Sequence, residues 1–232
     1  MSIETKYQEI LDKKNSAAIR SGRDPRDVTL MAVTKTRTID EVKEVVRAGA
    51  VALGENKVQE IMDKYDSIPD ASWHMIGHLQ TNKVKFIVDK VDLIHSVDSI
   101  HLAKEIDKRA KAIGRVVPVL VQINSAMEAT KTGIEPSKAR EVVSEIISTC
   151  ENIKVCGLMC IPPAAESPED VRPYFAEARQ IFEGLNELST DREHLDATVL
   201  SMGMSSDFEV AIEEGSTMVR VGSSIFGPRN YR

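Results

Sequence analysis

The stretch Val28-Thr-Leu-Met-Ala-Val-Thr-Lys35 decides the fold: it is a short apolar run that ends in one lysine. Because strand side chains alternate between two faces, every second residue from Thr29 to Lys35 points the same way. The opposite face is apolar too, and a strand that is apolar on both faces is typical of a parallel sheet covered by helices. The Lys35 ammonium is costly to bury unpaired, so we expect it at a mouth open to solvent or in a chemical role.

Outward from this strand, strand-like and helix-like runs alternate about eight times with short links. Such alternation indicates parallel βαβ units and favours a closed (β/α)8 TIM barrel over an open doubly wound sheet, which remains the alternative. No glycine-rich dinucleotide fingerprint follows the first strand, which removes the commonest reason for the open sheet. The predicted strands are residues 28–35, 50–54, 73–76, 92–97, 116–124, 154–161, 197–202 and 218–222. The predicted helices are residues 38–48, 57–65, 82–88, 99–113, 136–150, 168–188 and 206–214.

Residues 3–20 precede this alternation and repeat apolar side chains at helical spacing. We therefore expect an extra N-terminal helix that packs on the barrel. No linker or low-complexity segment is visible, so we expect a single domain over residues 1–232 and no appended domain.

The composition is that of an acidic globular protein, with a formal net charge of -6 and 42% hydrophobic residues. Because no stripe of Lys and Arg is present, we expect a small-molecule ligand and neither a nucleic-acid nor a membrane partner. The chain opens on charged amphipathic sequence rather than a signal peptide, and its most apolar run, 116–123, is far too short to span a bilayer. We expect a cytoplasmic protein that is a monomer or a weak dimer.

The three cysteines, Cys150, Cys156 and Cys160, are an odd number in a sequence without a secretory signal, which favours free thiols. Cys156 and Cys160 lie in one predicted strand, too close together along it to chelate a metal without further ligands. We therefore expect no metal site.

Polar residues follow most of the predicted strands. In a barrel the carboxyl ends of the strands collect on one face, where active sites form. The residues delivered there are Lys35, Asn56, His78, Ser96 and Asn124, together with the segments Ser201–Ser205 and Arg220–Gly227. This pattern predicts a polar site on that face.

The last two loops have the composition of a phosphate site. Barrels commonly hold phosphate with the loops after strands seven and eight and the start of a short extra helix. In Gly222-Ser223-Ser224 the glycine lets the backbone approach an anion, while amides and hydroxyls donate to it. Ser201 and the amides of Met202 and Gly203 would complete this cradle. Taken alone, these glycines and serines fit simple turns better.

Lys35 makes a phosphate site the better interpretation of these loops. A lysine that faces bound phosphate can form an imine with the aldehyde of a phosphorylated cofactor. Desolvation and nearby Arg220 would lower the pKa of this amine. The alternative interpretation is that Lys35 has no chemical role and extends its amine into water. Arg220 lies within the eighth predicted strand, so its guanidinium needs a buried acceptor. Either it pairs with a carboxylate such as Glu55, or it donates to a cofactor ring nitrogen, which leaves the ring a weak electron sink.

Motifs with a specific combination of residues occur in order along almost the whole chain. They are Ala32-Val-Thr-Lys35, Gly54-Glu-Asn-Lys-Val-Gln-Glu60, Trp73-His-Met-Ile-Gly77, Leu79-Gln-Thr-Asn-Lys83, Gly157-Leu-Met-Cys-Ile-Pro162, Leu200-Ser-Met-Gly-Met-Ser205, Asp207-Phe-Glu209 and Arg220-Val-Gly-Ser-Ser-Ile-Phe-Gly227. Together they resemble the signature blocks of the pyridoxal phosphate homeostasis proteins, which are small relatives of the alanine racemase barrel.

This resemblance implies that Lys35 forms an internal aldimine with pyridoxal 5′-phosphate (PLP) and that Arg220 faces the pyridine nitrogen. It places Asn56 beside the ring. The residues it implies for the phosphate are Ser201, Gly222 and either Ser223 or Ser224. The family's loop after the fifth strand corresponds to Glu128–Gly133 here, with Lys131 as a weaker candidate for cofactor transfer.

The resemblance also implies a carrier that holds PLP for vitamin B6 homeostasis, without turnover of its own and with apo-PLP enzymes as recipients. The alternative is a PLP-dependent amino-acid racemase, which needs a second base. Here the tyrosines lie in predicted outer helices or at the terminus, at positions 7, 65, 174 and 231. A phosphosugar enzyme on the same barrel is a third reading, and it would need carboxylates at the strand ends.

Overall fold

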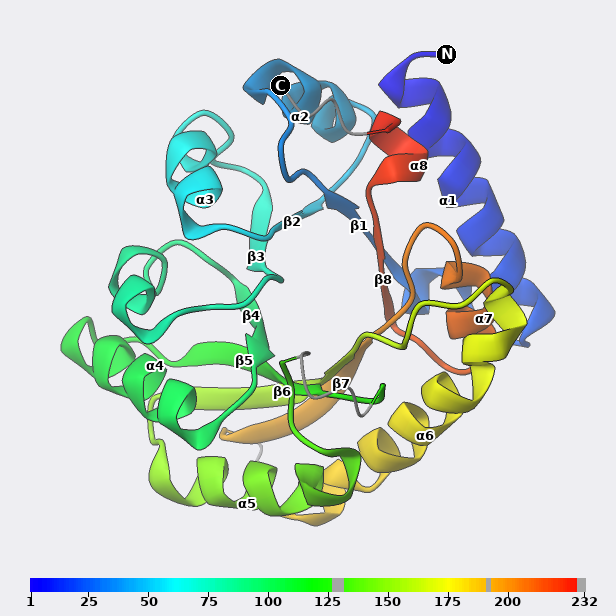
Figure 1. The fold of residues 1–232 in the computed structure, drawn as a ribbon. Coiled ribbons are helices and arrows are strands. Elements are labelled where there is room, and N and C mark those ends of the chain that lie inside the picture. Colours follow the sequence, from blue (N-terminus) through cyan, green and yellow to red (C-terminus); the bar gives the residue numbers. More distant parts are fainter. Residues whose placement is uncertain (127–131, 191–192, 229–232) are drawn as a thin grey trace.

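The protein is a closed barrel of eight parallel strands (Figure 1). The computed structural model describes residues 1–126, 132–190 and 193–228. The strands follow one another round the barrel in chain order, and β8 pairs with β1 to close it. The predicted barrel is therefore confirmed, and the open sheet is wrong. The strands are β1 (Thr29–Val33), β2 (Ala52–Glu55), β3 (Ser72–Met75), β4 (Leu93–Val97), β5 (Val117–Ile123), β6 (Ile153–Cys160), β7 (Leu195–Ser201) and β8 (Met218–Val221).

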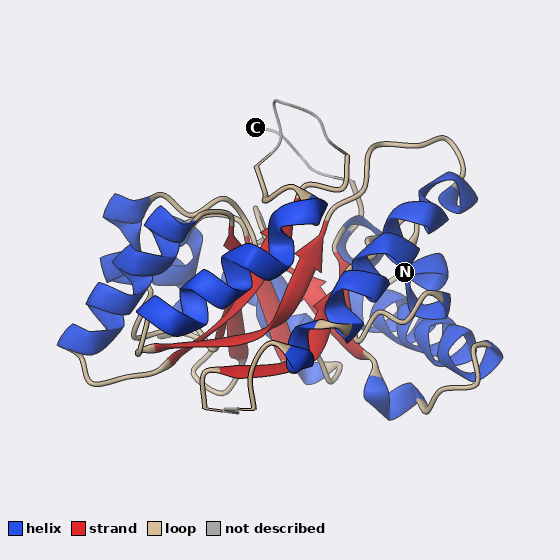
Figure 2. Ribbon diagram, turned by 90° about the horizontal axis from the view of Figure 1, so that it is seen from below, coloured by secondary structure: helices blue, strands red, loops and turns tan. Residues whose placement is uncertain are grey.

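Helices surround the strands on the outside of the barrel (Figure 2). The α-helices are α1 (Ile3–Arg20), α2 (Ile39–Arg47), α3 (Val58–Tyr65), α4 (Ile100–Ala112), α5 (Ala139–Thr149), α6 (Arg172–Glu183), α7 (Phe208–Glu213) and α8 (Ser223–Phe226). The 3-10 helices are η1 (Pro25–Asp27), η2 (Thr81–Phe86), η3 (Pro136–Lys138), η4 (Pro168–Val171) and η5 (Leu185–Glu187).

Three predicted helices differ in the structure, and the one predicted at 136–150 consists of η3 followed by α5. The segment predicted as an α-helix at 82–88 is the 3-10 helix η2, which has six residues and no side-chain cap, as is common for connectors. The helix predicted at 168–188 is divided into η4, α6 and η5. The 3-10 segments of the two divided helices lie at helix ends, where local pattern is least informative.

Strand β1 is buried on both faces, as its sequence predicts. Met31 packs inside the barrel with Ala52 and Met218. Leu30 and Ala32 belong to the large core between the strands and the helices. Gly54 makes room inside, because a Cβ atom there would lie 2.6 Å from the Met31 sulfur.

Local signals fix several helix starts. Thr38 and Glu41 form a capping box at the start of α2, in which the Thr38 hydroxyl accepts from the Glu41 amide and the Glu41 carboxylate accepts from the Thr38 amide. Ser99 caps α4 by accepting from the Leu102 amide at 3.2 Å. The capping box lies directly after the Lys35 turn, so it fixes the exit of that turn.

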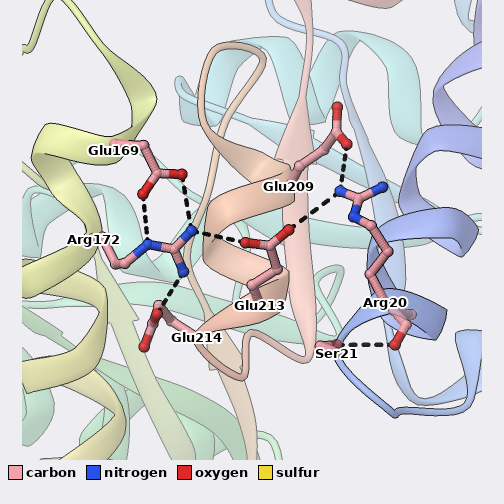
Figure 3. A network of polar contacts seen from close by, with 8 residues as sticks. Arg20, Ser21, Glu169, Arg172, Glu209, Glu213 and Glu214 are labelled. Atoms are coloured by element: carbon pink, nitrogen blue, oxygen red, sulfur yellow. Dashed lines mark hydrogen bonds and ion pairs between the residues drawn. The ribbon is translucent and has the colours of Figure 1, made fainter.

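The predicted N-terminal helix is present as α1, which packs against α7 and α8. Its buried side includes Ala17 and Ala18, which are fully buried. On the surface, Arg20 pairs with Glu209 and Glu213 of α7 (Figure 3). Glu213 also accepts from Arg172, which pairs with Glu169 and Glu214 as well, so the network joins α1, α7 and α6.

The three cysteines are free thiols, as predicted. In the described ranges no three His, Cys, Asp or Glu side chains are grouped so that they could hold a metal ion. Across the same part of the chain, no helix combines the length and the apolar character needed to cross a membrane.

Candidate functional site

The carboxyl ends of the strands surround a cavity of about 340 Å³. Residues of β1 and β8, and residues that follow β2, β3, β6 and β7, form its wall. Five residues predicted from the sequence line it: Lys35, Asn56, Arg220, Gly222 and Ser223. The other lining residues are Val33, Arg37, Ile76, Ile161, Met204, Ser205 and Ser206.

Lys35 is half-buried at the rim of this cavity, in the turn that follows β1. The turn begins where the Thr34 amide donates to Gly54 O of β2, and the Arg37 amide closes it by donating to Thr34 O. Asn56, on the neighbouring strand end, is held against Gly77, where a Cβ atom would lie 2.3 Å from Asn56 O. The glycine therefore permits the close approach of the β2 and β3 ends.

Arg220 points from β8 into the cavity floor and is 5% exposed. Its Nη1 donates to Ser201 O at 2.7 Å and to Ser201 Oγ at 2.8 Å, and its Nη2 donates to Cys160 O at 2.9 Å. Burial lowers the pKa of Arg220 to about 10, so the guanidinium stays charged at neutral pH. The predicted alternative of a salt bridge to Glu55 is wrong, because Glu55 instead pairs with Lys64 outside the barrel.

A chain of hydrogen bonds leads from Arg220 across the barrel interior. Ser201 Oγ lies 3.1 Å from His95 Nδ1, His95 Nε2 lies 2.9 Å from His74 Nδ1, and His74 Nε2 lies 3.0 Å from Ser72 Oγ. Burial lowers the pKa of His74 to about 4, and it lowers the pKa of His95 well below its ordinary value. Both imidazoles are therefore neutral.

One assignment of hydrogens uses every link of this chain. Arg220 can only donate, so Ser201 Oγ accepts from it and gives its own hydrogen to His95 Nδ1. His95 then carries its proton on Nε2 and donates to His74 Nδ1, and His74 donates from Nε2 to Ser72. The charge on Arg220 thus orients a series of dipoles from β8 to β3.

Donor groups converge beside the amine at the start of α8. The amides of Gly222 and Ser224 both lie near Ser205 Oγ, at 3.3 and 3.5 Å. The serine oxygen marks a position where an anionic oxygen would meet these donors. Gly222 is close to β1, since a Cβ atom there would lie 3.3 Å from Val33 O.

Of the residues predicted for the phosphate, Ser201 and Met202 lie away from the cavity, whereas Ser224 brings its amide to the donor cluster. Ser201 is fully buried beneath Arg220. Met202 is in the apolar core, and its amide already donates to Met218 O. Ser224 does not line this cavity but lines a hollow on the α1 side. Ser205, which the sequence pattern did not single out, takes the central place, although the motif Leu200–Ser205 contains it.

The remaining strand-end residues surround the cavity at a greater distance. His78 lines a neighbouring hollow that also includes Asn56, and it pairs with Asp98 at 3.2 Å. Ser96 is fully buried. Lys131 lies outside the described residues. Of the cavity-lining side chains in the described ranges none is a tyrosine, and Tyr7, Tyr65 and Tyr174 belong to α1, α3 and α6. Tyr231 lies outside the described ranges.

An amine, a buried cation and a set of converging N–H donors thus meet in one cavity. This combination suits a planar aldehyde that carries an anionic tail, because the amine can react with the aldehyde while the donors bind the anion. The donor set therefore fits a phosphorylated aldehyde cofactor.

Comparison with known proteins agrees with this arrangement. The family profile described as "Alanine racemase, N-terminal domain" matches residues 13–230. Alanine racemase from Clostridium difficile 630 superposes with a TM-score of 0.72 at 16% identity, over 98% of this chain and 58% of that chain. At that identity the superposition shows the fold alone. Fold and profile together define the class as the barrel proteins of the alanine racemase type.

Two proteins of higher sequence identity identify the family. The pyridoxal phosphate homeostasis protein of Aquifex aeolicus (strain VF5) is 45% identical over 225 residues, which cover 96% of each chain. The structure of PipY from Synechococcus elongatus PCC7942 with PLP bound has a TM-score of 0.77 at 35% identity, over 93% of this chain and 99% of that chain. The chain belongs to the pyridoxal phosphate homeostasis protein family.

Proposed function

We propose that this protein binds PLP in the cavity at the strand ends, attaches it covalently at Lys35, and holds it for intracellular PLP homeostasis. The observation that carries the proposal is the meeting of Lys35, Arg220 and the Gly222–Ser223 segment in one cavity. Family membership supports it, as does the similarity to PipY, whose structure contains PLP.

Each residue has a distinct role in this proposal. The aldehyde of PLP supplies a carbonyl carbon that the Lys35 amine can attack, with the loss of one water. The amides of Gly222 and Ser224, with the hydroxyls of Ser205 and Ser223, bind the phosphate. Arg220 faces the pyridine ring and donates to its nitrogen. A guanidinium does not protonate that nitrogen, so the ring withdraws electrons weakly.

The groups that line the cavity also support a holding role. Racemisation requires an acid or base on each face of the substrate carbon. Across the described part of the chain, the lining contains no histidine, tyrosine or carboxylate to act opposite Lys35. We therefore propose that the protein holds PLP and hands it to apo-PLP enzymes rather than converting an amino acid.

The test is an absorbance titration of the purified protein with PLP. We expect a visible band that borohydride abolishes, with the reduced cofactor mapped by mass spectrometry to the peptide of Lys35. The variant Lys35→Ala should lose the band and keep its circular dichroism spectrum. Lys57→Ala, which changes an exposed lysine of the adjacent loop, is the matched control and should keep the band.

Two outcomes would contradict this function. Persistence of the band in Lys35→Ala would place the attachment at another lysine. If the loaded protein supplies an apo-enzyme no differently from free PLP at the same concentration, with a phosphatase present to remove free cofactor, the handover role fails.

A further inference from the structure

The turn that carries Lys35 has an unusual backbone. Thr36, the residue after Lys35, has φ of 63°, and in the described ranges it is the one non-glycine residue with a positive φ. A threonine rarely adopts this conformation because its branched side chain crowds the backbone. Such strain persists only where the surroundings hold the residue firmly, and it is often found at functional sites.

Two side chains of α3 hold this turn. The Thr36 amide donates to Glu60 Oε2 at 2.6 Å. Lys64 Nζ donates to Thr34 O at 2.9 Å. These two groups belong to the peptide units on either side of Lys35, so α3 binds the backbone of Lys35 both before and after its Cα atom. Lys64 Nζ also donates to Glu60 Oε2 at 3.0 Å, which links the two contacts.

Glu55 supports this pair from beneath. Its Oε1 accepts from Lys64 Nζ at 2.8 Å and from Thr34 Oγ1 at 2.6 Å. Glu55 is fully buried and Lys64 is 5% exposed, so water screens this ion pair little. Glu55 Oε2 has no hydrogen-bond partner among the described residues, and burial raises the pKa of Glu55 to about 7.

This arrangement is a costly way to gain stability. Burying charged groups removes them from water, and a buried ion pair often contributes no more than well-packed apolar residues would. Here two carboxylates share one ammonium, and one carboxylate oxygen remains unsatisfied among the residues that the structure describes. What the charges accomplish is geometric: charge-assisted hydrogen bonds fix both peptide units beside Lys35 in one orientation.

We propose that Glu60 and Lys64, supported by Glu55, are positioning residues that hold the Lys35 turn so that its amine faces the cavity. We call Glu55, Glu60 and Lys64 the clamp. This inference rests on the proposed function, because the clamp would orient the amine for attack on the PLP aldehyde. The attack forms a bond from Lys35 Nζ to the aldehyde carbon, and the carbonyl oxygen leaves as water. None of the three clamp residues lines the cavity.

The test compares Glu60→Gln and Lys64→Met with Asp63→Asn, a matched control. Asp63 is on the exposed side of the same helix, where it accepts from Gln59. In the cofactor-free proteins, amide hydrogen exchange at Thr36 reports the clamp directly. After mixing with PLP, growth of the visible band reports the rate of attachment at Lys35.

We expect Glu60→Gln to speed exchange at Thr36 and to slow attachment on the order of tenfold, because a weaker neutral hydrogen bond replaces a charge-assisted one. Lys64→Met should do the same, and Asp63→Asn should match the parent in both. If Lys64→Met does not fold, Glu60→Gln decides alone, because the amide keeps the size of the side chain.

Three results distinguish failure of the positioning role, failure of the clamp contacts and failure of the proposed function. Faster exchange at Thr36 with attachment at the parental rate overturns the positioning role. Unchanged exchange at Thr36 in Glu60→Gln overturns the clamp itself. A parent protein that attaches no PLP at Lys35 refutes the proposed function, and the positioning role falls with it.

Discussion

Arg220 shows how a single side chain sets the chemistry of the cavity. Its hydrogen-bond acceptors in the described structure, two backbone carbonyls and one hydroxyl, are all neutral. The guanidinium charge is therefore not cancelled by a partner carboxylate and contributes a positive potential to the cavity. An anionic ligand is attracted by this potential, and a cationic ligand is repelled.

Gly157 in β6 provides a stability test at the scale of one residue. Its φ is 141°, and an added Cβ atom would lie 2.0 Å from Val199 O of the neighbouring strand. Since a backbone carbonyl of the sheet cannot move aside easily, we expect Gly157→Ala to lower the free energy of unfolding by about 3 kcal/mol or more. Urea denaturation measures this change.

Gly114→Ala is the control for that variant. Gly114 also has a positive φ, of 65°, but no atom lies within 4 Å of the place that a methyl group would take, so strain alone should cost about 1 kcal/mol. Equal losses in the two variants would show that the contact with Val199 has no effect.

At the scale of elements, β3, β4, β7 and β8 are joined through their side chains as well as their backbones. Ser201, His95 and His74 connect these strands by hydrogen bonds inside the barrel. A buried, fully satisfied polar chain specifies one register of the strands, because any shift would leave its members unpaired. The chain therefore holds Arg220 in place from below.

His74 and His95 make the free energy of unfolding sensitive to acid. Their pKa values in the folded state lie below the ordinary 6.5, so the unfolded chain binds more protons below that pH. The contribution of these groups to the free energy of unfolding is fully present above pH 6.5 and decreases as the pH falls below that value. Glu55 acts in the opposite sense between pH 4.5 and about 7, because its pKa is raised in the folded state.

The variant His95→Gln isolates the contribution of His95 to this pH dependence, because His74 and Glu55 are present in both proteins. Between pH 7 and pH 5 the parent should lose about 2 kcal/mol more unfolding free energy than the variant. Urea denaturation at both pH values measures the difference, and nitrogen-15 shifts of the parent should show both imidazole protons on Nε2. Parallel pH profiles would mean that the pKa of His95 does not differ between the folded and the unfolded chain.

Element by element, the sequence was informative where the cause is local. The two apolar faces of β1 and the helix at α2 depend on neighbouring residues, and both were predicted. The segment Ser201–Ser205 was expected on this face, but the contacts of Ser205 with the α8 amides and of Glu60 and Lys64 with the Lys35 turn were not, because they join residues 17 to 30 positions apart across different elements. No spacing rule connects such pairs before the fold is known. The meeting of Lys35 with Arg220 was predictable because strand ends share one face of a barrel.

At the scale of the whole molecule, α1 is fastened to the barrel both by apolar contact and by surface charges. Ala17 and Ala18 are fully buried, whereas Arg20 is about half exposed in its pairs with α7. Exposed ion pairs contribute little because water and salt screen them. The apolar side of α1 therefore carries its attachment.

A pair of variants tests this assignment. Ala18→Leu should lower the free energy of unfolding by about 1–3 kcal/mol, because the larger side chain has no space at a fully buried position. Arg20→Met should leave the urea midpoint within error of the parent. A large loss in Arg20→Met, or its dependence on salt, would assign the attachment to the charged network of Figure 3 instead.

The pairing of β8 with β1 has a consequence for biosynthesis. Lys35 follows β1 and Gly222 follows β8, so two neighbouring walls of the cavity come from the first and the last strand of the barrel. A nascent chain on the ribosome cannot bring these walls together until β8 has emerged and docked. A chain that stops before β8 would therefore lack Arg220, Gly222 and Ser223 and have no complete cavity.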